Sequence, residues 1–229
     1  DSIRRQLVSD VPIGTFLSGG LDSSIISAVA VKYKGPINTY SVDYRDNDRY
    51  FTATKFQPNS DSDYIGLMER HIHANGHRVI LDTDELVSGL FEAAEARDLP
   101  GMADVDSSML LLCRNARKTS TVILSGECAD EIFGGYPWYR DPEVRAINGF
   151  PWAQTTDYRA SFVAPELLNW LDPREFVDNR YQETLRQADI LPGTSPLEQR
   201  MKEMMLLNLR WFMQTLLDRK DRMSMWSGL

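Results

Sequence analysis

A seven-residue run of small and polar side chains between two apolar segments constrains this chain more than any other feature. The run is SGGLDSS, residues 18–24, and it lies between the apolar segments Val11–Leu17 and Ile25–Val31. An apolar run, a glycine pair and a second apolar run predict a strand, a tight turn and a helix. The chain should therefore contain a βα unit with a glycine-rich connection.

The chemistry of this turn suits a phosphate ligand. Glycines let the backbone approach a ligand closely, and the start of a helix presents N–H groups and a positive dipole end to an anion. Hydroxyl and carboxylate side chains in the same seven residues could hold a metal ion beside a polyphosphate. The run fits neither GxxxxGK[ST] nor GxGxxG. An ordinary glycine-rich βα turn is the structural alternative.

Composition narrows the function classes. The 229 residues carry a net charge of −8, which argues against a nucleic-acid binder, since such proteins usually present a basic face. The longest apolar runs fall short of the ~20 residues that span a membrane, so we expect no membrane partner. Cys113 and Cys128 form no CxxC motif, and a reducing cytoplasm is the expected location. A homodimer is one assembly open to such a chain.

Short apolar strands alternate with helical patterns along the first half of the chain. This alternation predicts an α/β fold with a parallel sheet flanked by helices. The expected strands are residues 11–18, 37–43, 78–82 and 121–125. The expected helices are residues 21–34, 64–75, 83–97 and 107–118, the last with Asp106 as its N-cap. We expect loops at 44–63 and 99–105, where a cover over a substrate could form.

The second half of the chain has a different character. Residues 137–229 predict a mainly helical part, with helices at 164–170, 173–187 and 196–218, after an α/β core of residues 1–136. Ligands of parallel sheets bind beyond the carboxyl ends of the strands. Ser18, Val42 and Ser125 lie at such predicted ends and should face one crevice.

A second motif, SGECADEIFGGY at residues 125–136, follows the fourth predicted strand. It places three carboxylates within five residues: Glu127, Asp130 and Glu131. If a helix begins here, Glu127 shares a face with the other two acids. Clustered carboxylate oxygens suit Mg²⁺ bound together with ATP phosphates. A helix cap is the alternative reading of Ser125-Gly126-Glu127 alone.

The two motifs together resemble the synthetase domain of glutamine-hydrolysing asparagine synthetases, which belong to the ATP pyrophosphatase (PP-loop) superfamily. Residues 11–14 (VPIG) and 217–225 (LDRKDRMSM) are similar to that family too, so the resemblance spans the whole chain. It implies a Rossmann-like fold of the adenine nucleotide α-hydrolase type. It also implies ATP and magnesium as cofactors and catalysis by a ligase.

Site residues follow from the resemblance by position. Those matching the lining of the AMP portion of ATP are Leu17, Val42, Ser125 and Gly126. Those matching the pyrophosphate loop are Ser18, Gly19, Gly20, Leu21, Asp22, Ser23 and Ser24. Asp22 and Asp130 match magnesium-binding acids, and the expected catalytic residues are Glu127, Asp130 and Lys220.

Two of these positions carry a second interpretation. Lys220, in a basic run with Arg219 and Arg222, could neutralise phosphate charge or simply be a solvated helix end. Cys128 stands where the family often has glycine, and we expect a small buried residue rather than a nucleophile.

The reaction implied by the resemblance is synthesis of asparagine from aspartate through β-aspartyl-AMP, with release of AMP and pyrophosphate. Ammonia would come from glutamine through an N-terminal glutaminase domain that this chain lacks. The chain opens on Asp1 without a methionine, so we expect it to be a piece of a longer protein.

Other function classes compete with this interpretation. One is a related amidotransferase-like synthetase that closes a β-lactam or peptide ring. Another is a nucleotide-binding module without turnover, although both Glu127 and Asp130 are present. A third is an ATP pyrophosphatase that modifies or charges tRNA, which would need a basic surface.

Overall fold

The computed structural model describes residues 1–53, 59–99 and 101–229, except for the side chain of Asp104. These residues form two compact units, one of residues 1–127 and 216–229 and the other of residues 128–215. The domain division expected from the sequence, at residue 136, stays a prediction. No helix within the described ranges is long and apolar enough to cross a membrane.

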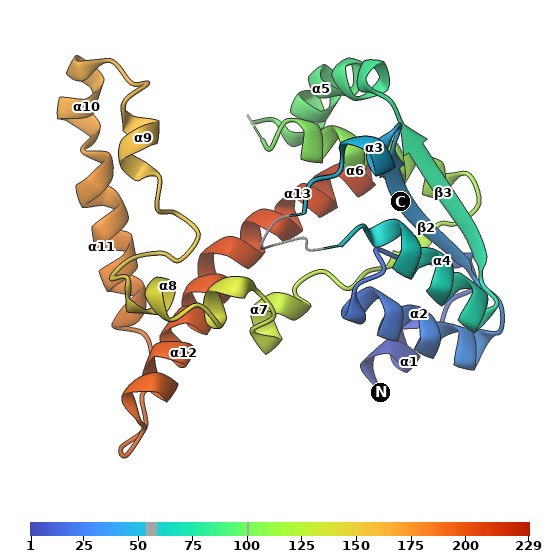
Figure 1. Ribbon diagram of the computed structural model, residues 1–229, viewed down its shortest axis with the longest axis horizontal. Helices are drawn as coiled ribbons and strands as arrows, with labels where there is room; N and C mark the ends of the chain where they lie inside the picture. The colour runs from blue at the N-terminus through green and yellow to red at the C-terminus, as the bar shows by residue number, and fades with distance from the viewer. Residues whose placement is uncertain (54–58, 100) are drawn as a thin grey trace. The chain divides into compact units, whose positions relative to one another are not determined.

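The first unit contains a four-stranded sheet in which every neighbouring pair is parallel. Its strands lie in the order β3-β2-β1-β4. The neighbours β2 and β3 are labelled in Figure 1. They are β1 (Ile13–Phe16), β2 (Asn38–Tyr44), β3 (Asn75–Leu81) and β4 (Val122–Leu124). The predicted α/β class with a parallel sheet is confirmed, although β1 and β4 are shorter than expected and β3 begins three residues earlier.

The strand order creates a switch point between β1 and β4. The chain proceeds from β1 to β2 and β3 in one direction, then returns to place β4 on the other side of β1. Thr15 of β1 accordingly lies opposite Thr39 on one side and Leu124 on the other. Open parallel sheets bind ligands at such a point, beyond the carboxyl ends of the strands.

Helices cover both faces of the sheet because successive side chains of a strand point to opposite faces. Tyr40 of β2 packs with Leu112 and Ala116 on one face, whereas the hydroxyl of neighbouring Thr39 donates to Glu69 on the other, at 3.3 Å. The helices on the Glu69 face are α1 (Ser2–Gln6), α2 (Leu21–Lys34) and α4 (Asp61–Ile72). The opposite face carries α5 (Thr83–Arg97) and α6 (Asp104–Arg117) (Figure 1).

Two of the predicted helices, α2 and α5, have the expected bounds. The expected N-cap role of Asp106 is wrong, because α6 begins at Asp104 and Asp106 is its third residue. From that position the carboxylate reaches back and accepts the N–H of Met102 at 2.9 Å. The side chain thus satisfies a backbone donor ahead of the helix, as the third residue of a capping box does.

The two expected loops are partly helical. Residues 44–63 contain the short helix α3 (Asn47–Tyr50) and the first turn of α4, while 54–58 lie outside the described residues. In the second loop, residue 100 lies outside them, and 104 and 105 belong to α6.

The second unit is helical throughout its regular structure. Two aromatic clusters form its core, one around Trp138, Tyr139 and Met204 and the other around Phe150, Tyr181 and Leu207. Its elements are α7 (Ala129–Phe133), the 3₁₀ turn η1 (Pro137–Tyr139), α8 (Pro142–Ala146), α9 (Thr156–Ala160), α10 (Pro165–Leu171), α11 (Pro173–Leu185), α12 (Pro196–Leu207) and the π-helix η2 (Asn208–Phe212).

The helix expected over residues 196–218 is thus interrupted by η2 and continues as α13 (Met213–Trp226). From Leu216 onward α13 belongs to the first unit, where Met223 is fully buried against Ala93, Ala96 and Leu110 of α5 and α6.

Candidate functional site

The SGGLDSS loop joins β1 to α2 at the carboxyl end of the sheet. Gly20 is the N-cap of α2 and, having no side chain, makes no capping hydrogen bond to the first turn of this helix. Ser23 instead turns back into the loop, where its hydroxyl accepts the N–H of Ser18 at 3.2 Å and lies 3.0 Å from the Ser18 hydroxyl. The loop is therefore internally braced, while the helix end stays open to an anion.

The position of Gly19 requires glycine, both for its backbone conformation and for its close contacts. Its φ is 78°, in the left-handed region, and a Cβ there would lie 3.0 Å from the carbonyl oxygen of Asp61 and from Cβ of Tyr64. The loop thus packs directly against the first turn of α4. Among the remaining loop residues Ser18, Gly20 and Leu21 are exposed, Asp22 and Ser24 are half-buried, and only Ser23 is buried.

The second motif reaches the same place from β4. A Cβ on Gly126 would lie 3.0 Å from the backbone nitrogen of Ser23 and 3.1 Å from Cβ of Asp22. The turn after β4 therefore packs against the first turn of α2, at the switch point of the sheet. The first motif and the first three residues of the second, 125–127, thus form one surface within the first unit.

A lysine from α13 completes this surface. The ammonium of Lys220 donates to the hydroxyl of Ser125 at 2.6 Å and pairs with the carboxylate of Glu127 at 2.6 Å. It also lies 5.6 Å from the ring centre of Phe16 in β1. Ser125 accepts the N–H of Glu127 as well, at 3.2 Å, so the lysine, the serine and the glutamate form a connected group.

Burial strengthens the electrostatics of this group. The side chains of Lys220 and Glu127 are 18% and 19% exposed, and Arg219 lies 3.9 Å from the same Glu127 oxygen. Nearby, burial raises the pKa of the Cys113 thiol to about 12, against the opposing effect of the Lys220 charge. A thiol with that pKa stays protonated at neutral pH, so Cys113 is a packing residue.

The three acids of the second motif occupy different environments. Glu127 precedes α7, which begins at Ala129, so the face that it was expected to share with Asp130 and Glu131 does not form. Asp130 belongs to the second unit, where its carboxylate lies against Gly135 and a Cβ on that glycine would collide with it. Glu131 is fully buried in the same unit and accepts the hydroxyl of Tyr136 at 2.6 Å.

The backbone conformation at Cys128 is one that glycine adopts more easily than other residues. Cys128 is the N-cap of α7 with a φ of 74°, a left-handed conformation that costs an L-residue free energy. The side chain is half-buried rather than buried as expected.

Val42 lies within β2, two residues before its end, and not at the strand end. Its half-buried side chain packs in the cluster of Tyr40, Leu112 and Ala116 that also includes Phe16. Leu17, also expected near the nucleotide, is almost completely buried and donates its N–H to Tyr40 at 2.9 Å.

Comparison with known proteins decides the family. A family model described as asparagine synthase matches residues 1–229. The chain belongs to the asparagine synthase family. It is 47% identical over its full length to asparagine synthetase [glutamine-hydrolyzing] 3 of Bacillus subtilis (strain 168), of which it spans 38%.

Other members of the asparagine synthase family match part of the chain. Asparagine synthetase [glutamine-hydrolyzing] 1 of B. subtilis is 32% identical over 62% of the chain and 21% of its own length. The mouse asparagine synthetase [glutamine-hydrolyzing] is 30% identical over 61% of the chain and 24% of its own length. The chain thus spans well under half the length of these relatives.

Several features of the site were not foreseen from the sequence. The contact between Ser125 and Lys220 joins residues 95 positions apart, and no local sequence pattern predicts it. The packing of Asp61 and Tyr64 on Gly19 is of the same kind. Arg219 lies beside Glu127 in the site, and the basic run at 219–222 was the sequence signal that could have indicated it.

Proposed function

We propose that the protein containing this chain synthesises asparagine from aspartate, with ATP converted to AMP and pyrophosphate through β-aspartyl-AMP. The observation that carries the proposal is the packing of the Gly126 turn on the first turn of α2, which joins both family motifs at the switch point of the sheet. The family membership supports the choice of amino acid. Ammonia would come from glutamine through a glutaminase domain of the complete protein.

In the first step, an oxygen of the aspartate β-carboxylate attacks the α-phosphorus of ATP. The bond from this phosphorus to the oxygen bridging to the β-phosphorus breaks, and pyrophosphate leaves with the electron pair. The open N-terminus of α2 and the loop before it, residues 18–24, hold the departing pyrophosphate. Lys220, fixed by Ser125 and Glu127, places its charge beside the α-phosphate.

In the second step, ammonia attacks the carbonyl carbon of β-aspartyl-AMP and gives up a proton. AMP then leaves with the electrons of the broken carbon–oxygen bond. Glu127 is the carboxylate placed to take the proton, because it lies next to Ser125 and Gly126, which line the AMP site in this proposal. Leu17 and Val42 would line the same site from the sheet.

Magnesium fits the donor set of this proposal. Within residues 1–53, 59–99 and 101–229, no group of three or more His, Cys, Asp or Glu side chains could hold a metal. A magnesium ion that is bound with ATP phosphates needs only one or two protein carboxylates, and Asp22 is the proposed one in the first unit. The magnesium-binding role expected of Asp130, in the second unit, stays a prediction. When bound, Mg²⁺ supplies charge neutralisation on the phosphates. A cytoplasmic location and a homodimer remain parts of the proposal.

The decisive experiment is aspartate-dependent exchange of labelled pyrophosphate into ATP by the complete natural protein. Asp22→Asn should abolish exchange, because the carboxylate that pairs with the phosphate-bound metal is lost. The matched control is Asp84→Asn, which removes an exposed carboxylate from the first turn of α5 and should leave exchange intact. Exchange that persists in Asp22→Asn contradicts the assigned role, and wild-type exchange that needs no aspartate contradicts the proposed reaction.

A further inference from the structure

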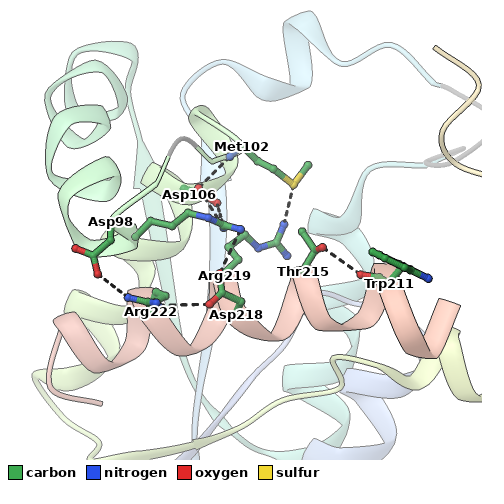
Figure 2. Close-up of polar contacts among 9 residues, drawn as sticks. Asp98, Met102, Asp106, Trp211, Thr215, Asp218, Arg219 and Arg222 are labelled. Atoms are coloured by element: carbon green, nitrogen blue, oxygen red, sulfur yellow. Dashed lines mark hydrogen bonds and ion pairs between the residues drawn. The ribbon is translucent and has the colours of Figure 1, made fainter. Parts of the chain in front are cut away.

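Arg219 of α13 is a buried cation that lacks a carboxylate of its own among the described residues. The residue is 9% exposed. Its Nη1 donates to the sulfur of Met102 at 3.7 Å, and Nε is buried without a hydrogen-bond partner among the residues that the structure describes. Figure 2 shows the side chain directed at the Met102 thioether. A thioether is a weak acceptor, and burying a guanidinium without strong acceptors is costly.

A second buried arginine, Arg97, has its positive charge balanced by carboxylates. Arg97 pairs with Asp106 at 3.4 Å through Nη1 and with Asp218 at 3.4 Å through Nη2. Further along α13, Arg222 is held by Asp98 and Asp218 (Figure 2). Each of these arginines therefore contacts two carboxylates, with Asp218 common to both.

Arg219 instead has a single carboxylate within 4.0 Å among the described residues, and it shares that carboxylate with Lys220. The Glu127 oxygen that lies 3.9 Å from its Nη2 is held by Lys220 at 2.6 Å. One carboxylate thus faces two cations in a buried position, which leaves the group with surplus positive charge. The surplus lies at the candidate site itself, since Lys220 also contacts Ser125.

We propose that Arg219 binds the α-carboxylate of the amino-acid substrate, an inference that rests on the proposed function. A guanidinium presents a planar fork of donors that matches a carboxylate, and Nε is one of the donors left unused. The β-carboxylate has to attack phosphorus, and a guanidinium that held it would withdraw the electrons it needs. The α-carboxylate is the anion of aspartate that can stay bound throughout both steps.

The test compares aspartate with β-alanine, which has the same amine and β-carboxylate but lacks the α-carboxylate. Pyrophosphate exchange by the complete natural protein gives kcat/KM for each amino acid. Arg219→Gln should lower the preference for aspartate about 10- to 100-fold, the usual effect of losing a charge-assisted hydrogen bond pair. The loss should come from aspartate, through its KM, while kcat/KM for β-alanine and the KM for ATP stay unchanged.

Two further variants guard against a merely structural effect. Arg219→Lys keeps the charge in the same place without the fork, so it should recover part of the preference for aspartate. Arg222→Gln removes an arginine of the same helix that already has its carboxylates, and it should leave the preference unchanged. Thermal unfolding of each variant, without ligands, shows whether the fold persists.

The possible outcomes are distinct. An unchanged preference in folded Arg219→Gln and Arg219→Lys overturns the inference and leaves the proposed function standing. A raised KM for ATP with an unchanged preference assigns Arg219 to a phosphate and also overturns it. Absence of aspartate-dependent exchange in the wild-type protein overturns the proposed function, and the inference with it.

Discussion

The two glycines of the first motif differ in how well they would tolerate a side chain. Gly19 occupies a position that only glycine fits, whereas the position of Gly20 has room for a Cβ. Gly19 has a φ of 78° and lies against the backbone of Asp61, whereas a Cβ on Gly20 would meet nothing closer than the Ser18 hydroxyl at 3.5 Å. The φ of Gly20 is −69°, which any residue can adopt. The two glycines therefore have different reasons to be present.

Gly19→Ala should destabilise the first unit by about 2 kcal/mol, because it combines a left-handed backbone with a close contact. Gly20→Ala, its neighbour, should cost under about 0.5 kcal/mol. Urea unfolding followed by far-ultraviolet circular dichroism measures both. Equal costs for the two variants would mean that the contact with α4 does not constrain the loop.

The sequence predicted which residues belong to the site better than it predicted which residues contact them. Ser125, Gly126 and Glu127 follow a strand as expected, and a chain-wide pattern of motifs indicated them. Their shared contact with Lys220 depends on how α13 packs, which is a tertiary property. Glu127 lies outside α7 because the left-handed Cys128 intervenes, and spacing alone cannot reveal a backbone sign change.

Among the elements, α5, α6 and α13 are held together by charge as well as by apolar packing. Arg97 at the end of α5 pairs with Asp106 of α6 and Asp218 of α13. The side chain of Asp106 is 4% exposed and that of Asp218 is 48% exposed. The two halves of this ion-pair group should therefore contribute unequally to stability.

Asp106→Asn should cost about 3 kcal/mol of unfolding free energy, because it leaves Arg97 buried beside an uncharged group. Asp218→Asn removes the solvent-exposed partner of the same arginine and should cost under about 1 kcal/mol. Both values come from urea denaturation at moderate ionic strength, because salt weakens the exposed pair with Asp218 more than the buried pair with Asp106. Similar costs would show that Arg97 is not desolvated by the packing of the three helices.

Elements with clear terminal signals were the most predictable. The start of α5 follows from its capping box, in which Asp82 and Glu85 exchange hydrogen bonds, and the end of α2 follows from Gly35. The start of α6 was misjudged because its N-cap, Ala103, has no capping side chain. The break of the long C-terminal helix at η2 has no residue signal comparable with a proline.

For the whole molecule, the first unit is assembled from two separate stretches of chain. Residues 1–127 supply the sheet, and residues 216–229 supply the helix that buries Met223 against α5 and α6. Without that helix, Leu110 and Ala93 would lose part of their cover. The first unit is thus compact in space but interrupted in sequence by the second unit.

A variant that joins Glu127 to Leu216 through a flexible Gly/Ser linker of about eight residues should therefore unfold cooperatively in urea. A chain of residues 1–127 alone should not, because burial of Met223 and Leu216 is lost. Circular dichroism and native-state hydrogen exchange distinguish the two. Cooperative unfolding of residues 1–127 alone would show that α13 is dispensable for the fold of the sheet.

The return of α13 to the first unit also sets an order of events on the ribosome. The strands emerge before α13, and their unit stays incomplete while residues 128–215 are synthesised, which takes on the order of 10 s. During that interval the apolar face of α5 and α6 that later receives Met223 is exposed to the crowded cell. The first unit is therefore begun before the second unit and completed after it, and a nascent chain of this kind should depend on a chaperone that can cover that face.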